Sequence, residues 1–137
     1  MADSTGQPPS ITGIRVLVVD DNRDALEVLE IALGIAGAQV IPAISVDDAV
    51  RIDPAGFDVV ITDLSMPHRS GYELLQIMRE RAPAVPVVAV TGFSVHPEPQ
   101  RQATGGFARY LTKPVDHNEL VRVIHQLVRR ARTNDSA

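Results

Sequence analysis

The sequence contains no cysteine. A disulfide framework, a thiol nucleophile and a cysteine-ligated metal site are therefore excluded. The chain also lacks an excess of basic residues, because 13 Lys and Arg stand against 17 Asp and Glu, giving a formal net charge of -4. This balance offers no general attraction to a phosphate backbone or to anionic lipid, so we expect no direct contact with nucleic acid.

Long hydrophobic runs are missing as well. No stretch of about 18 consecutive apolar residues, the length needed to cross a bilayer, is present. The N-terminus also lacks a basic segment followed by an apolar one, which is the pattern of an export signal. We therefore expect a protein of the cytoplasm that does not contact the membrane.

The two ends of the chain differ in composition from its middle. Residues 1–12 are small and polar and contain proline, and residues 133–137 are similarly polar, so we expect flexible tails. In residues 13–132, short β-branched apolar runs alternate with segments of helical spacing. This alternation is typical of βα repeats around a parallel sheet, and the length suits one core. We predict a single α/β domain over residues 13–132.

The element boundaries follow from apolar periodicity, capping residues and prolines. The predicted strands are residues 15–19, 39–42, 57–62, 87–90 and 108–111. Predicted helices cover 23–36 after a cap at Asp20, Asp21 or Asn22, a short segment from Ser45 to Pro54, 71–81, and a last helix from Asp116 to Arg132. Between the fourth and fifth strands, Pro97 and Pro99 permit at most a short helix over residues 98–104.

Polar side chains follow four of the predicted strands at the point where each strand ends. Asp20 and Asp21 follow the first strand, Asp63 the third, Thr91 the fourth and Lys113 the fifth. The carboxyl ends of parallel strands lie along one edge of a sheet, where open α/β sheets form ligand crevices. We therefore expect these five residues to meet in one pocket.

The residue types in this pocket point to metal-assisted phosphoryl chemistry. Three neighbouring carboxylates repel one another unless a cation joins them, and an all-oxygen ligand set favours Mg²⁺ or Mn²⁺. Lys113 adds a fixed positive charge, and the Thr91 hydroxyl is able to donate a hydrogen bond to a phosphoryl oxygen. A carboxylate attacking phosphorus in line would form an acyl phosphate. The spacing alone leaves open which of the three carboxylates attacks.

Four motifs carry a family resemblance. They are Val-Leu-Val-Val-Asp-Asp-Asn at 16–22, Asp-Leu-Ser-Met-Pro at 63–67 with Gly71 behind it, Val-Thr-Gly at 90–92 and Tyr-Leu-Thr-Lys-Pro at 110–114. In this order they are highly specific, and from about residue 14 to residue 130 the chain resembles the receiver domain of response regulators in two-component signalling. The resemblance implies a flavodoxin-like, doubly wound parallel sheet of five strands in the order 2-1-3-4-5.

The resemblance also implies roles for single residues. It implies that Asp63 accepts a phosphoryl group from a phospho-His donor, which is a sensor histidine kinase or a histidine phosphotransfer protein. Such a domain assists its own phosphorylation and dephosphorylation but turns over no separate substrate. Further implied roles are cation binding by Asp20, Asp21, Asp63 and the backbone carbonyl of Ser65, bonding of Lys113 to the phosphorylation site, and switching through Thr91 and Tyr110. The Lys113–Pro114 peptide is often cis in this family.

Some features depart from the family pattern or are not explained by a core. Gly92 stands where the family often has Ala, and Gly-Gly-Phe-Ala at 105–108 replaces the commoner Gly-Ala-Asp-Asp. On the first helix, Val28, Ile31 and Ile35 form a second apolar stripe opposite the expected core stripe. This stripe is either ordinary exposed aliphatic surface or a docking face for a partner helix, from the kinase or phosphotransfer protein or from a second copy of the chain.

Other functions give different expectations. A phosphatase or phosphotransferase of the haloacid dehalogenase type also uses an Asp nucleophile, but it resembles Asp-x-Asp-x-Thr after the first strand, where this chain has Asp-Asp-Asn-Arg. A docking module without phosphorylation would not need the acidic pair, Asp63, Thr91 and Lys113. A Rossmann nucleotide site would need a Gly-rich turn after the first strand. We expect either a stand-alone regulator, controlling a downstream protein, or a receiver from a hybrid histidine kinase or larger regulator.

Overall fold

The computed structural model describes residues 8–52, 56–66, 69–92 and 106–136. The elements in this part of the chain are β1 (Arg15–Val19), α1 (Arg23–Ile35), β2 (Gln39–Ala43), α2 (Val46–Arg51), β3 (Val59–Asp63), α3 (Gly71–Arg81), β4 (Val87–Thr91), β5 (Arg109–Thr112) and α5 (His117–Ser136). The strands form one parallel sheet in the order β2-β1-β3-β4-β5. The predicted fold class and strand order are confirmed.

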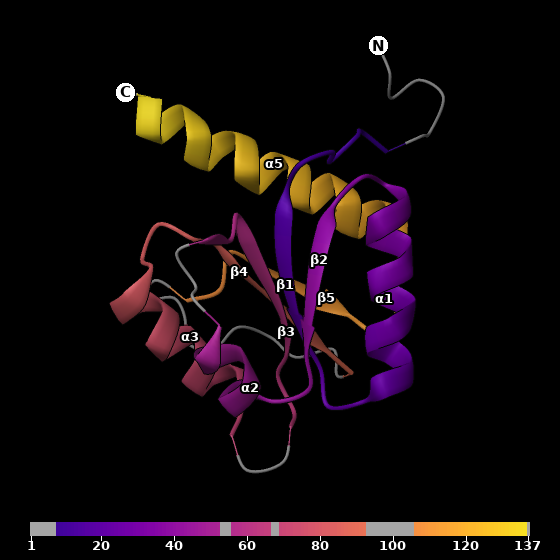
Figure 1. The fold of residues 1–137 in the computed structure, drawn as a ribbon, viewed down its shortest axis with the longest axis vertical. Coiled ribbons are helices and arrows are strands. Elements are labelled where there is room, and N and C mark those ends of the chain that lie inside the picture. The colour runs from indigo at the N-terminus through magenta and orange to yellow at the C-terminus, as the bar shows by residue number, and fades with distance from the viewer. Residues whose placement is uncertain (1–7, 53–55, 67–68, 93–105, 137) are drawn as a thin grey trace.

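The sheet lies between two helical layers, which Figure 1 shows on either side of the strands. Side chains of a strand alternate between its two faces, so Val16 and Val18 of β1 join one apolar cluster while Leu17 and Val19 join the other. The first cluster holds the buried residues of α1 and α5, and the second holds those of α2 and α3. Burial on both faces explains why the central strands read as continuous apolar runs.

Helix caps determine where the chain leaves the sheet edge. Of the three residues predicted as caps for α1, Asn22 takes the role, and its side chain accepts a hydrogen bond from the Ala25 N–H at 3.0 Å. Asp20 and Asp21 therefore stay at the carboxyl end of β1. Ser45 caps α2 in the predicted way, accepting the Asp48 N–H at 3.0 Å.

The lower boundary of β3 differs from the prediction. The strand starts at Val59 rather than at residue 57, because the Asp58 carboxylate accepts the Arg15 N–H at 2.9 Å in place of a backbone carbonyl. Pro42 lies inside β2, where a missing N–H is tolerated because β2 is an edge strand.

Structural elements extend into both segments expected to be tails. Ile11 is fully buried in the α1–α5 core layer, and its N–H donates to the Ala36 carbonyl at 3.1 Å, so the packed domain begins before residue 13. At the other end, α5 continues past Arg132 to Ser136. The short helix predicted for residues 98–104 lies outside the described residues. None of the described helices combines the length and apolar character needed to span a bilayer.

Candidate functional site

The predicted site residues lie at the carboxyl edge of the sheet. Asp63 is the last residue of β3 and pairs with Val90 of β4, and Thr91 is the last residue of β4. The Lys113 N–H donates to the Thr91 carbonyl at 2.8 Å, which places Lys113 one step beyond the end of β5. The strand register therefore brings the ends of β3, β4 and β5 to the same level.

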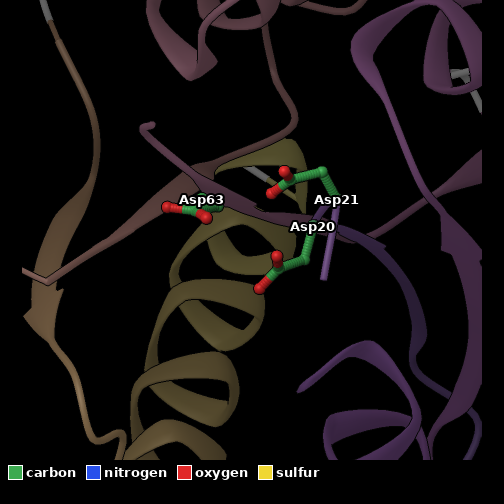
Figure 2. A group of neighbouring side chains, drawn as sticks. All are labelled: Asp20, Asp21 and Asp63. Carbon is green, nitrogen blue, oxygen red and sulfur yellow. The ribbon is translucent and has the colours of Figure 1, made fainter. Parts of the chain in front are cut away.

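Three carboxyl groups converge at this edge. One carboxylate oxygen from each of Asp20, Asp21 and Asp63 lies within 4.8 Å of the others. Figure 2 shows the three side chains meeting at one place, two from the end of β1 and one from the end of β3. Asp20 and Asp63 are buried, with exposed fractions of 4% and 6%, whereas Asp21 is exposed. The three oxygens are close enough to share one metal ion, with Asp21 on the solvent side.

Lys113 closes the other side of the cluster. Its ammonium nitrogen lies 3.2 Å from a carboxylate oxygen of Asp63, to which it donates a hydrogen bond, and 3.7 Å from one of Asp20. It is the only lysine of the chain. Partial burial on its own would lower the pKa of the Lys113 ammonium, but the hydrogen bond to Asp63 and the surrounding carboxylates outweigh it. The net effect raises this pKa above its ordinary value.

For the pKa of Asp20, the effect of burial outweighs the effects of its hydrogen bond and of Lys113. Burial raises the pKa of the Asp20 carboxyl above its ordinary value, and the negative charges of Asp63 and Asp21 raise it further. The Asn22 N–H, which donates to Asp20 at 2.9 Å, and the charge of Lys113 lower it but do not outweigh burial. One ammonium group therefore does not compensate three carboxylates, two of them buried. A hard divalent cation would supply the missing positive charge, and the carboxylate oxygens are a donor set that fits Mg²⁺ or Mn²⁺.

Backbone groups hold the acids in place. The Ser65 N–H donates to the second carboxylate oxygen of Asp63 at 3.2 Å. Asp63 thus accepts one bond through each oxygen, from Ser65 on one side and Lys113 on the other. These two bonds fix the plane of the carboxylate.

Gly71 has a steric role that the sequence motif does not reveal. A Cβ atom at this position would lie 2.6 Å from the Asp63 carbonyl oxygen and 3.2 Å from the Leu64 Cα. The first residue of α3 therefore packs directly against the backbone of the candidate phosphoacceptor. The only sequence signal of this contact is a glycine that starts a predicted helix and follows the motif containing Asp63.

Thr91, Tyr110 and the Lys113–Pro114 peptide complete the set of predicted site positions. Thr91 is buried at the end of β4, and the Lys113–Pro114 peptide is cis. Tyr110 lies on β5 with its hydroxyl oxygen buried, and its ring contacts Phe107 edge to face at a centroid distance of 5.4 Å. Phe107 belongs to the segment that departs from the family pattern, and the sequence alone did not indicate its packing.

A cavity of about 430 Å³ opens beside the acids. Its polar end is formed by Asp20, Asp63 and Lys113. Its apolar wall comes from α1 and from the segment after Lys113, and includes Val28, Ala25, Pro114 and Val115. The sequence predicted the polar end, whereas the apolar wall depends on how α1 lies against the segment between β5 and α5.

Comparison with known proteins identifies the class to which this fold and site belong. A model of the response regulator receiver domain matches residues 16–125. The chain belongs to the response regulator receiver domain family. The acids at 20, 21 and 63 and Lys113 all lie within the matched region.

Individual relatives agree with this assignment. The chain is 33% identical over 114 residues to an uncharacterized 14.6 kDa protein of Leptolyngbya boryana, covering 81% of this chain and 87% of that protein. It is 32% identical to the response regulator protein PilR of Pseudomonas aeruginosa, covering 84% of this chain but 26% of PilR. With the cell cycle transcriptional regulator CtrA of Caulobacter vibrioides it shares 27% identity, over 87% of this chain and 52% of CtrA. The chain thus spans about half of CtrA and about a quarter of PilR.

Solved structures show the same architecture. A response regulator receiver domain protein from Clostridium thermocellum superposes with a TM-score of 0.80 at 30% identity, covering 88% of this chain and 98% of that one. The response regulator TrrA from Thermotoga maritima, solved in complex with Mg²⁺ and beryllium fluoride, superposes with a TM-score of 0.71 at 25% identity, covering 83% and 98% of the two chains.

Proposed function

We propose that this receiver domain accepts a phosphoryl group from a phospho-His donor onto Asp63 and changes conformation to control a partner protein. The observation that carries the proposal is the position of the Asp63 carboxylate, 3.2 Å from the Lys113 ammonium and within 4.8 Å of the Asp20 and Asp21 oxygens. A nucleophilic carboxylate, a fixed cation and two further metal ligands thus occupy one edge of the sheet.

Each residue has a chemical task in this proposal. An Asp63 oxygen forms the new P–O bond while the P–N bond to the donor imidazole breaks, and the imidazole leaves with the bonding electrons and takes up a proton. Lys113 compensates negative charge on the phosphoryl oxygens, and the Thr91 hydroxyl donates a hydrogen bond to one of them. Asp20, Asp21, Asp63 and the Ser65 carbonyl would hold Mg²⁺ or Mn²⁺. When bound, this ion neutralises phosphoryl oxygens that the carboxylates would otherwise repel.

The structure favours Asp63 as the nucleophile over the two other acids. Asp63 ends the central strand β3, and its two oxygens are fixed by Lys113 and Ser65. Asp20 and Asp21 follow β1 side by side and suit a paired role at the metal. The structure of the similar protein TrrA, solved with Mg²⁺ and beryllium fluoride together, supports the use of a divalent cation by such a domain.

The partner proposed as phosphodonor is a sensor histidine kinase or a histidine phosphotransfer protein. We propose that this donor docks on the outer stripe of α1, formed by Val28, Ile31 and Ile35. Their exposed fractions are 50%, 57% and 83%. Val28 also lines the cavity beside Asp63, so the stripe leads directly to the site. The proposed function places the chain in the cytoplasm with its donor. Both the stand-alone regulator and the receiver of a larger regulator remain compatible with it.

Intact-mass measurement after incubation with acetyl phosphate and Mg²⁺ tests the proposal. The expected result is one added phosphoryl group on the wild type and none on Asp63→Asn. Labelling of Asp63→Asn to the wild-type extent would show that another residue accepts the phosphoryl group. Sustained release of phosphate from an added phosphomonoester would instead indicate the haloacid dehalogenase type of enzyme.

A further inference from the structure

Three aromatic side chains contact one another in a row from β5 to the protein surface. The Phe107 ring lies 5.4 Å from the Tyr110 ring at an interplanar angle of 80°. On its other side it lies 5.5 Å from the Tyr72 ring at 63°. Both contacts are edge to face, the arrangement that the charge distribution of aromatic rings favours. We call Tyr110, Phe107 and Tyr72 the aromatic relay.

The two ends of the relay lie in different environments. Tyr110 is on β5, three positions before Lys113, and pairs with Ala89 of β4. Phe107 is buried between the two tyrosines with an exposed fraction of 7%. Tyr72 follows Gly71 in the first turn of α3 and is 39% exposed. The relay therefore connects the strand that carries Lys113 with an accessible point on α3.

We propose that Phe107 transmits the state of Asp63 from Tyr110 through the edge-to-face ring contacts to Tyr72 on α3. This inference rests on the proposed function. Protein interiors are close-packed, so a change in the position of the Tyr110 ring leaves a void against Phe107 unless Phe107 follows. Because Phe107 also packs on Tyr72, its movement changes the environment of the exposed ring. The face of α3 around Tyr72 then reports phosphorylation.

A second route to Tyr72 exists and must be separated from the relay. Gly71 precedes Tyr72 and packs directly on the Asp63 backbone, so a change at Asp63 is able to reach α3 without any aromatic contact. Only the relay depends on the ring of Phe107. Substitution of Phe107 therefore distinguishes the two routes.

The chain contains two tyrosines and no tryptophan, which makes the test direct. Fluorotyrosine incorporation gives two ¹⁹F NMR resonances, which Tyr72→Phe and Tyr110→Phe assign. On addition of beryllofluoride with Mg²⁺, we expect both resonances of the wild type to shift. In Phe107→Leu, the Tyr110 resonance should still shift and the Tyr72 shift should be lost. Phe107→Tyr keeps a ring and adds a third resonance, and it should restore the Tyr72 shift.

Matched variants control for general loosening of the core. Val46→Ala truncates a buried side chain of α2 in the same apolar layer and should keep both shifts. If Phe107→Leu does not fold, Phe107→Met fills the site with a flexible side chain that lacks a ring edge. Tyr72→Leu should leave the Tyr110 resonance shifting, because the relay runs from Tyr110 outward to Tyr72.

The outcomes separate the relay from the proposed function. A Tyr72 shift that persists in Phe107→Leu would assign the signal to Gly71 and overturn the relay. A wild-type protein in which Tyr110 shifts and Tyr72 does not would overturn it as well. If neither resonance responds and Asp63 takes up no phosphoryl group from acetyl phosphate, the proposed function itself is wrong and the relay falls with it.

Discussion

The Lys113 ammonium nitrogen lies 3.2 Å from an Asp63 carboxylate oxygen, although the two residues are 50 positions apart in the sequence. The parallel register of β3, β4 and β5 creates this contact by ending the three strands at one edge. Because the Asp63 carboxylate shares this edge with Asp20 and Asp21, one ammonium group faces three acids. The three acids therefore carry more negative charge than Lys113 compensates.

The first prediction concerns Asp20 and the stability of the metal-free protein. Its pKa is raised on folding, so the folded state binds this proton more readily than the unfolded state. The Asp20 contribution to the free energy of unfolding should therefore fall as pH rises from the ordinary carboxyl pKa through the raised folded value, and stay low above it. Asp20→Asn should remove this loss and raise the melting temperature at neutral pH without metal.

The same substitution, Asp20→Asn, should weaken metal binding although it stabilises the metal-free protein. Asp20→Asn removes one of the proposed carboxylate ligands, so we expect weaker Mg²⁺ affinity by calorimetry and a smaller rise in melting temperature on Mg²⁺ addition. Asp58→Asn, at the opposite end of β3, is the control and should leave Mg²⁺ affinity unchanged. Equal Mg²⁺ affinity in Asp20→Asn and wild type would remove Asp20 from the metal site.

The second prediction concerns the protonation of Lys113. As the only lysine of the chain, it gives a single side-chain signal in NMR of lysine-labelled protein. That signal should titrate above the ordinary lysine pKa, and the pKa should fall in Asp63→Asn, because the hydrogen bond to Asp63 raises it. The stabilising contribution of Lys113 should be fully present below the ordinary lysine pKa and be lost as pH rises through the folded value. An unchanged titration in Asp63→Asn would contradict the observed pairing.

The third prediction concerns the contact between Gly71 and the Asp63 backbone. Gly71→Ala places a methyl group 2.6 Å from a carbonyl oxygen, so the backbone must shift. Overpacking of this kind costs about 1–3 kcal/mol, which denaturant unfolding measures. We also expect slower phosphorylation by acetyl phosphate, because the displaced backbone carries Asp63, the proposed phosphoacceptor.

Gly34→Ala is the matched control for this variant. Gly34 lies in α1 with open space around its Cα, and alanine in a helix is favoured over glycine by about 0.5–1 kcal/mol. This variant should be slightly more stable than the wild type and be phosphorylated at the same rate. If Gly71→Ala behaved like Gly34→Ala, the close approach of α3 to Asp63 would have no energetic consequence.

Local signals in the sequence predicted most element boundaries but not the long-range packing. The bounds of β1 and α3 match the prediction, because an apolar run determines the first and helical apolar spacing followed by Pro83 determines the second. The start of β3 was wrong because it depends on the Asp58–Arg15 hydrogen bond, which joins residues 43 positions apart. Ile11 was assigned to a tail because its contacts with Ala36 and the α1–α5 core layer leave no periodic pattern.

In the candidate site, too, some contacts could be predicted from the sequence and others depend on long-range packing. Strand-end positions alone predicted that Asp20, Asp63 and Lys113 would meet, and the distances confirm that they do. The strand order required the family resemblance, because apolar periodicity does not specify which strands are neighbours. The edge-to-face contacts of Phe107 with two tyrosines could not be predicted, since they depend on how α3 and β5 approach each other in space.

The last prediction concerns the outer stripe of α1. Ile31 and Ile35 are among the most exposed large apolar side chains in the described part of the chain, and the proposed function assigns them to docking of the phosphodonor. Replacing both with Ser should slow phosphotransfer from a phosphorylated histidine phosphotransfer protein and leave acetyl phosphate labelling at the wild-type rate. The reason is that a small donor needs only the Asp63 pocket, whereas a protein donor must bind the surface beside it. Gln76→Ser, at an exposed position of α3, is the matched surface control and should change neither rate. Single-turnover labelling measured by intact mass compares the two donors, and equal slowing with both would show that the stripe supports the fold rather than docking.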